Sequence, residues 1–418
     1  MTRPSAGARA ATAGVAVALG ALMAACAPNT GPAGPAAPGE RCTTLGPEDP
    51  FVAEQRTIFL GGDGSYPIYR IPSVVTTGSG VVLTFTEARP STADPGSGRI
   101  DVVVRRSDDC GRSWGSLTVV GDAGDDDAHN PTAVVVPLAD GGERVMLFYG
   151  QRPRSAGGEF DLPAGFGPGT ATMWMRTSDD DGATWTAPRD ITAQVKDPTW
   201  RVASFGPGRA IVTRWGTPSA PPQRIVVPGW FSSDARGTGS FVAWSDDEGR
   251  SWHGSSTPAG VATDESQVVE TTDGSLLLDT RAEGFRRVYR SVDGGATWGS
   301  PTAGLTMPPV MSSLSRDRAV RDGDAFDRLL HTSIARDGRF DLRVLSSRDE
   351  GVTWDRSRLL VPGIAQYFGP HAPLTARSGS STSRRACATT GTAPGSAGRS
   401  GFFDSIPTGS ILTEPDTA

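Results

Sequence analysis

The sequence predicts an all-β fold of the β-propeller class, in which blades of antiparallel sheet repeat around a central channel. The first observation is an eight-residue pattern, Ser-x-Asp-x-Gly-x-(Ser/Thr)-Trp, which recurs five times in the 418-residue chain, at 107–114, 178–185, 245–252, 291–298 and 347–354. The second is a strand-like run before most copies, such as Asp101-Val-Val-Val-Arg105. A strand and turn repeated in this way are typical of folds whose units stack on one another.

Each copy of the pattern, called an Asp box below, has the chemistry of a rigid hairpin turn. The short side chains of its Ser and Asp can hydrogen-bond to backbone groups a few residues on, and its Gly supplies a position with positive φ. The closing Trp buries a large ring and holds the turn against the next layer. We therefore expect the boxes to be structural and give them no catalytic role.

Composition narrows the function classes. Hydrophobic residues make up 37% of the chain, enough for one large all-β core or two small ones. The net charge of −6, without any basic run, argues against a nucleic-acid partner. The four histidines are scattered and show no metal-ligand spacing, so we expect neither a metal nor a cofactor.

The N-terminus has the features of an export signal over residues 1–26. Arg3 and Arg9 precede an apolar, Ala-rich segment that is short for a membrane span. It ends Leu22-Met-Ala-Ala-Cys26, which resembles a bacterial lipobox with Cys26 as the residue that is lipidated after cleavage. We expect an exported cell-surface lipoprotein, with plain secretion as the alternative.

Three further segments follow. Residues 27–48 include a Pro-, Gly- and Ala-rich stretch and are expected to form a flexible linker, and residues 49–370 the propeller. Residues 371–418 are expected to be a low-complexity, disordered tail. In an oxidising compartment Cys42 and Cys110 are a candidate disulfide, which the sequence leaves open.

An arginine stands inside the second strand expected in the propeller. The run Ser65-Tyr-Pro-Ile-Tyr-Arg-Ile-Pro-Ser73 places Arg70 among apolar residues, where a cation is costly unless an anion meets it. A core salt bridge is one explanation, and the carboxylate of a bound ligand is the other.

The stretch Tyr69-Arg-Ile-Pro72, followed by the Asp boxes, resembles the bacterial branch of the exo-α-sialidase (neuraminidase) family. The resemblance covers residues 51–367 and implies a six-bladed propeller. It also implies a monomeric glycoside hydrolase that releases terminal sialic acid from glycoproteins, glycolipids or oligosaccharides. A non-catalytic carbohydrate-binding propeller or an inactive sialidase remnant is the alternative, and a trans-sialidase would share the same site residues.

The resemblance assigns site residues in chain order. Arg89 matches a substrate-contacting arginine, and Asp94 matches the acid/base aspartate, although Asp94-Pro-Gly96 also fits a simple turn. Asn130 stands where the family has the Asp of an Asp-Pro pair that contacts the N-acyl group. Because Asn still forms hydrogen bonds, we expect a retuned contact there.

The second half of the chain supplies the remaining candidates. Glu265 and Arg281 match the buried glutamate and the second arginine of the family, whereas the rival Glu270 precedes a turn and is predicted to be solvated. Arg339 matches the third arginine, with Arg336 as its rival.

Tyr367 matches the nucleophilic tyrosine of the family. A sialoside carries a carboxylate on its anomeric carbon, which repels an acidic nucleophile and which guanidinium groups bind by forked hydrogen bonds. The resemblance implies that Glu265 takes the phenol proton of Tyr367, while Asp94 protonates the departing oxygen and later activates water. Because the reaction then proceeds through two displacements at the anomeric carbon, the configuration of that carbon is retained. The sialoside carboxylate would be held by the three arginines, Arg70, Arg281 and Arg339.

The C-terminal region departs from the family. Residues 376–399 are rich in Ser, Gly, Thr, Ala and Arg and show no strand periodicity, where the family has a Leu-Tyr-Glu strand. A natural linker is one account and a frameshift is another. We favour the frameshift, which would leave the last blade without its closing strands.

Overall fold

Strands dominate the computed structural model, which describes residues 54–91, 99–154, 160–336, 339–371, 385–391 and 399–407. Within these ranges, helical structure is limited to the single turn α1 (Thr192–Val195) and the 3-10 turns η1 (Asp63–Ser65) and η2 (Val320–Asp322). None of the helices in the described ranges is long and apolar enough to cross a membrane.

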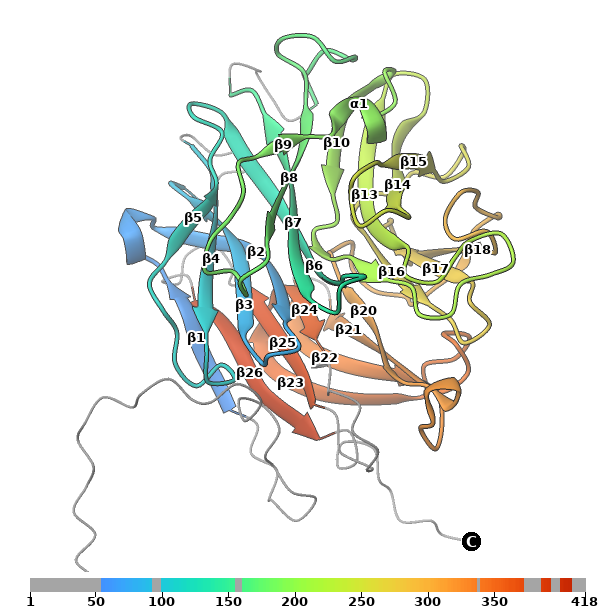
Figure 1. Cartoon of the computed structure of the whole chain (residues 1–418). Helices are drawn as coiled ribbons and strands as arrows, with labels where there is room; N and C mark the ends of the chain where they lie inside the picture. The colour runs from blue at the N-terminus through green and yellow to red at the C-terminus, as the bar shows by residue number, and fades with distance from the viewer. Residues whose placement is uncertain are drawn as a thin grey trace, which may run out of the picture. The chain divides into compact units, whose positions relative to one another are not determined.

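Five sheets are built from strands close together in the sequence, and each forms a blade (Figure 1). Blade 1 consists of β2 (Ile68–Thr76), β3 (Val82–Arg89), β4 (Asp101–Ser107) and β5 (Thr118–Gly121). Blade 2 consists of β6 (Asp127–Pro137), β7 (Glu143–Arg152), β8 (Thr172–Ser178) and β9 (Arg189–Asp190), with β11 (Gly208–Arg209) parallel to β6.

The next three blades continue this pattern of antiparallel neighbours. Blade 3 consists of β10 (Trp200–Phe205), β13 (Ile225–Ser233), β14 (Gly237–Ser245) and β15 (His253–Ser256), with β12 (Ile211–Val212) paired to β13. Blade 4 consists of β16 (Ser266–Glu270), β17 (Leu276–Thr280), β18 (Arg287–Ser291) and β19 (Thr302–Ala303). Blade 5 consists of β20 (Ser313–Arg318), β21 (Arg328–Arg336), β22 (Phe340–Ser347) and β23 (Arg356–Ile364).

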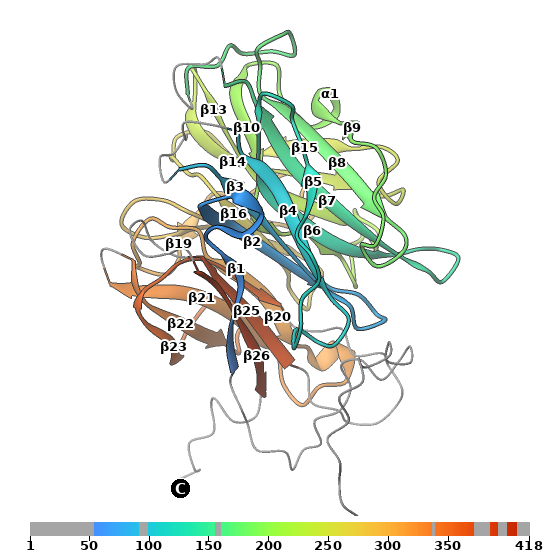
Figure 2. The same cartoon turned by 90° about the vertical axis from the view of Figure 1, so that its left-hand side faces the viewer.

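A further sheet combines the two ends of the folded region. Its order is β1 (Glu54–Leu60), β26 (Arg399–Pro407), β25 (Arg385–Gly391) and β24 (Gln366–His371). In Figures 1 and 2 the blue strand β1 lies beside the red strands of this sheet. The expectation of an all-β propeller is confirmed.

The C-terminal expectation needs a correction, because β25 and β26 fall within residues 371–418, which we predicted to be disordered. The physical reason is that strand pairing is stabilised by backbone hydrogen bonds, which β25 and β26 make on both sides. These do not require the apolar alternation that the prediction looked for.

The N-terminal predictions concern residues that the structure does not describe. The signal segment with Cys26 and the linker with Cys42 both lie outside the described residues. Cys110 is disulfide-bonded.

The Asp boxes have the predicted structural role. In the first copy, Ser107 Oγ accepts the N–H of Gly111 at 2.8 Å, and Asp109 Oδ1 accepts the N–H of Ser113 at 2.8 Å. The other four copies repeat both bonds. The tryptophan of a box packs on the preceding blade: the ring of Trp185 meets Phe85 edge-on, with centroids 5.7 Å apart.

The hydrophobic core lies between neighbouring blades. Phe148 of blade 2, for example, packs against Phe205 and Trp252 of blade 3, with ring centroids 5.4 and 5.1 Å away. Because both faces of an inner strand meet other blades, β3 is buried at all eight positions. Two of these positions hold Glu87 and Arg89, so charged groups are carried into the interior.

Candidate active site

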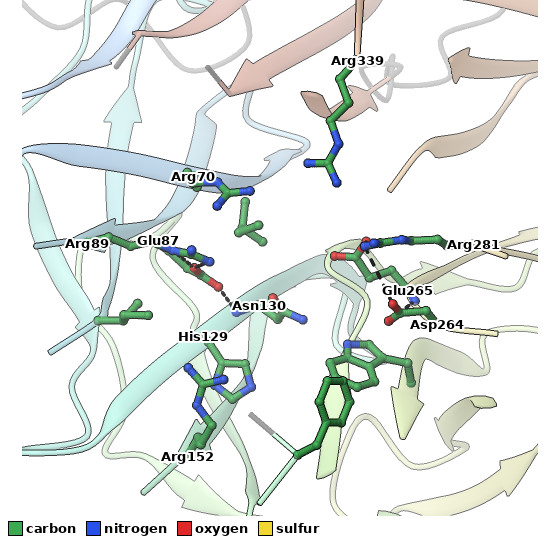
Figure 3. Close-up of a pocket in the computed structure, with 14 residues that line it drawn as sticks. Arg70, Glu87, Arg89, His129, Asn130, Arg152, Asp264, Glu265, Arg281 and Arg339 are labelled. Atoms are coloured by element: carbon green, nitrogen blue, oxygen red, sulfur yellow. Dashed lines mark hydrogen bonds and ion pairs between the residues drawn. The ribbon is translucent and has the colours of Figure 1, made fainter. Parts of the chain in front are cut away.

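A cavity of about 380 Å³ opens among the inner strands, and all five blades contribute to its wall. Six of the residues that the sequence singled out line it: Arg70, Arg89, Asn130, Glu265, Arg281 and Arg339. Figure 3 shows the guanidinium groups of Arg70, Arg281 and Arg339 directed toward one space from three sides.

Two of the three predicted catalytic residues are not seen in this cavity. Asp94 lies outside the described residues. Tyr367 is described only through its backbone, as the second residue of β24, and its side chain lies outside the description. The same holds for the side chain of Arg336, the rival of Arg339, at the end of β21.

A bulge in β2 places Arg70. The register of β2 against β3 shifts between Arg70 and Ser73, and Ile71 has a φ of 65°, which is uncommon for a β-branched residue. The side chain of Ile71 is buried in an apolar cluster that includes Met307 and Leu342. Such strain persists only where the surrounding structure determines it, and here it turns the chain at the residue that follows Arg70.

Glu87 connects two residues of the cavity wall. Its Oε2 accepts a hydrogen bond from Arg89 Nε at 2.6 Å, and its Oε1 accepts the backbone N–H of Asn130 at 2.7 Å. Asn130 has a φ of 54°, a conformation that Asn tolerates better than most residues, and its Nδ2 donates to the carbonyl of Phe205 at 3.3 Å. Glu87 thus holds an arginine and a strained peptide in fixed positions.

Glu265 and Arg281 are paired through both backbone and side chain. Arg281 N donates to Glu265 O at 2.8 Å, and Arg281 Nη1 donates to Glu265 Oε2 at 2.8 Å. Asp264 Oδ2 lies 3.8 Å from the same Nη1. Burial raises the pKa of Asp264, and the Arg281 guanidinium and the N–H of Glu265 oppose that rise. The cavity therefore brings two adjacent carboxyl groups to one arginine.

Arg339 lies in the turn between β21 and β22, with a φ of 63°. Its carbonyl accepts the N–H of Ala365 at 2.8 Å, which ties this turn to the segment just before β24. The strand that contains Tyr367 is therefore anchored, through its backbone, to a residue of the cavity wall.

Sequence reasoning missed several residues of the wall. Glu87, Asp264 and Arg152 line the cavity, and Arg152 Nη2 donates to Asp127 Oδ2 at 3.0 Å. His129 faces Gly150 across the β6–β7 pair, where a Cβ would lie 2.8 Å from its Nε2. A charged residue in an apolar strand was the available signal for Glu87 and Arg152, as it was for Arg70.

Glu270 corrects a second prediction, since it is buried and not solvated. Its carboxylate accepts backbone N–H groups from Arg214 at 2.5 Å, Trp215 at 3.0 Å and Gly216 at 2.9 Å. The turn after Glu270 suggested exposure, but a segment more than fifty residues earlier in the chain covers it. Glu270 does not line the cavity that contains Glu265.

The wall of the cavity favours an anionic ligand with an apolar part. Five arginines outnumber the three carboxylates, and a guanidinium binds a carboxylate through two parallel hydrogen bonds. An aromatic pair completes the wall: Phe160 and Trp230 have ring centroids 6.3 Å apart.

Residues 92–371 match the family described as BNR repeat-like domain. The chain belongs to this family. It is 31% identical over 338 residues to a sialidase of Micromonospora viridifaciens, covering 76% of this chain and 50% of that protein. It is 29% identical over 332 residues to a sialidase of Bacteroides fragilis, covering 74% and 58% respectively.

A solved structure shows the same relationship. The structure of a Hadza microbial sialidase aligns with a TM-score of 0.71 at 26% identity, covering 86% of this chain and 69% of that one. The chain spans about half of the Micromonospora protein and somewhat more of the Bacteroides one. The resemblance to sialidases with BNR repeats, drawn from Tyr69-Arg-Ile-Pro72 and the Asp boxes, is confirmed.

Proposed function

We propose that this chain is an exo-α-sialidase that hydrolyses terminal sialic acid from glycoproteins, glycolipids or oligosaccharides. The observation that carries the proposal is the convergence of Arg70, Arg281 and Arg339 on one space inside a propeller of this family. The sialoside carboxylate sits on the anomeric carbon, so binding it also positions the bond to be broken. The similarity to sialidases over three quarters of the chain supports the same substrate class.

In this mechanism the arginines bind the carboxylate and the reacting groups come from opposite sides of the sugar. Tyr367 attacks the anomeric carbon, Glu265 accepts its phenol proton, and Asp94 protonates the departing oxygen. Asp94 then activates the water that releases sialic acid with its configuration retained. The ion pair between Glu265 and Arg281 supports this role of Glu265, because it orients the carboxylate.

Asn130 and Arg89 bind the rest of the sugar in this proposal. Arg89 is held rigidly by Glu87, which suits a residue that must meet a substrate without rearrangement. Asn130 presents an amide in place of the carboxylate of the family, so its contact to the N-acyl group is retuned.

We also infer that the sheet of β1, β24, β25 and β26 is a sixth blade. Pairing of β1 with β26 closes the ring with strands from both ends of the folded region, and this supports the inference. We further propose that the protein is exported with Cys26 as its lipid anchor, with plain secretion as the alternative. We also propose that it is a monomer.

The test is release of a fluorogenic aglycone from an α-sialoside by the purified chain, compared with Tyr367→Phe. Tyr149→Phe is the matched control, because it removes the hydroxyl of a tyrosine that is buried in the core between blades 1 and 2. We expect turnover by the wild type and by Tyr149→Phe, and its loss in Tyr367→Phe. Proton NMR of the first-formed sialic acid would then report retention as the α-anomer.

Binding without turnover would favour the alternative, a non-catalytic carbohydrate-binding propeller. The replacement of the family's Asp by Asn130 is the observation on its side. In that case the wild type would bind sialyllactose in calorimetry and release no aglycone, and Tyr367→Phe would bind equally well.

A further inference from the structure

A second cavity, of about 60 Å³, lies at the opposite end of the inner strands. Glu265 directly precedes β16 and lines the large cavity, whereas Glu270 ends β16 and lines the small one. The five residues of this strand span about 16 Å, so the two cavities are distinct.

Most charges around the small cavity are balanced within the protein. Arg214 Nη1 lies 2.5 Å from Asp322 Oδ2, and Arg316 Nη1 donates to Glu350 Oε1 at 2.8 Å. The carboxylate of Glu270 is occupied by the three backbone N–H groups described above.

Arg209 is the exception. It belongs to β11, which contacts the strands β2, β6 and β24 near the centre of the ring. Among the described residues no carboxylate forms an ion pair with it, and the charged group that acts on it is another cation, Arg214. Desolvation, and to a smaller extent the neighbouring cation Arg214, lower the pKa of Arg209 to about 10. Arg209 therefore remains a cation at neutral pH, in a place where a cation needs an anion.

Two more donors on the same wall lack a partner within the described part of the chain. Ser315 Oγ belongs to a side chain that is only 4% exposed, and it makes no hydrogen bond there. The Nε of Arg316 is likewise buried and unpartnered, although its two other nitrogens bind Glu350. Buried donors in folded proteins are normally satisfied, so two unpartnered donors beside the uncompensated cation Arg209 on one cavity indicate a missing acceptor.

We propose that the cavity bounded by Arg209, Ser315 and Arg316 binds a small inorganic oxyanion of the size of phosphate or sulfate. An oxyanion would compensate the charge of Arg209 and accept hydrogen bonds from Ser315 Oγ and Arg316 Nε. The volume of the cavity, about 60 Å³ against 380 Å³ for the large one, excludes a glycoside. This inference does not depend on the proposed sialidase activity.

The arginines of the large cavity also attract anions, so the test is made in a chain that lacks one of them. In the full chain with Arg339→Gln, inorganic phosphate is titrated by calorimetry at constant ionic strength set with chloride. We expect saturable binding that persists with Arg339→Gln alone and is lost when Arg209→Gln is added. Arg250→Gln, which removes one exposed positive charge elsewhere, is the matched control and should keep the binding. Equal binding with and without Arg209→Gln, or no saturable binding at all, would overturn the proposal.

Thermal unfolding tests the proposal in a second way, because Arg209→Gln and added phosphate are each expected to change Tm. In phosphate-free buffer, Arg209→Gln should raise Tm, because it removes a partly buried charge that no carboxylate of the described residues balances. With saturating phosphate the wild type should gain Tm and the variant should not. A lower Tm for Arg209→Gln in phosphate-free buffer would mean that the protein itself balances Arg209, and the proposal would fail.

Discussion

Glu87 Oε1 accepts the backbone N–H of Asn130 at 2.7 Å, across the boundary between blades 1 and 2. Glu87 is fully buried, and its other oxygen binds Arg89, which is 3% exposed. One carboxylate therefore fixes two residues of the cavity wall that lie on different blades. The positions of two residues in the cavity wall therefore depend on a residue that the sequence did not identify.

Glu87→Gln should reduce stability and substrate binding together. The amide cannot balance the buried guanidinium of Arg89, and breaking a buried ion pair from one side costs about 3 kcal/mol or more. We expect that loss in urea unfolding and a KM for an α-sialoside raised about tenfold, which is about 1.4 kcal/mol. The exposed Glu283→Gln is the control and should change neither quantity. An unchanged KM would show that Glu87 does not affect substrate binding.

Glu265→Gln and Glu270→Gln should separate catalysis from stability. Loss of a general base lowers kcat by about 10²-fold or more, so we expect this in Glu265→Gln. Glu270→Gln should lower Tm, because its carboxylate accepts three N–H groups, and leave kcat near the wild-type value. Steady-state kinetics with thermal unfolding measure both effects, and the reverse pattern would exchange the roles of the two glutamates.

Gly182→Ala tests the packing of an Asp box on the preceding blade. Gly182 has a φ of 78°, and a Cβ there would lie 2.7 Å from the side chain of Leu83. A positive φ costs a non-glycine residue about 1–2 kcal/mol, and overpacking adds about 1–3 kcal/mol. Gly141→Ala, at a φ of 89° with nothing within 4 Å of the added Cβ, isolates the first cost. In urea unfolding, Gly182→Ala should therefore lose more stability than Gly141→Ala, and equal losses would contradict the packing argument.

The Asp boxes should make the protein sensitive to acid. Burial alone would raise the pKa of Asp247, but hydrogen bonds from Ser251 and Ser245 lower it from 3.8 to about 2. A folded-state pKa below the unfolded one contributes stability that is complete above the unfolded pKa and is lost as the pH falls through the folded value. Tm should therefore stay level above about pH 5 and fall between about pH 4 and 2.

Ser251→Ala removes one donor to Asp247 and serves as the matched variant for the acid experiment. In Ser251→Ala, the stability that ionised Asp247 contributes should be lost at a higher pH than in the wild type, because the carboxylate has lost one hydrogen bond. Coincident acid transitions of the two proteins, followed by thermal unfolding from pH 6 to 2, would speak against this account of the boxes.

The repeat and the arginines were predictable because their signals are local. An Asp box contains all of its own hydrogen-bond partners within eight residues, so the sequence alone specifies its geometry. Arg70 was conspicuous because a charge in an apolar strand conflicts with its surroundings.

The missed and misjudged residues depend on partners far along the chain. Glu87 acquires its role from Asn130, 43 positions away, and Glu270 is buried by a loop 54 to 56 positions away. No local pattern encodes which blades come into contact or in what register. The strands β25 and β26 were not predicted for a related reason, because they pair through backbone groups that every sequence has.

The pairing of β1 with β26 has a consequence for how the protein is made. Glu54 pairs with Asp404, so the first strand of the folded region meets its partner only after 350 further residues have been made (404 − 54). Contacts this distant in sequence form late, because loop closure must precede them. Until then β1 presents an open edge to its surroundings, and newly made chains are exposed to mispairing with one another while those residues are made.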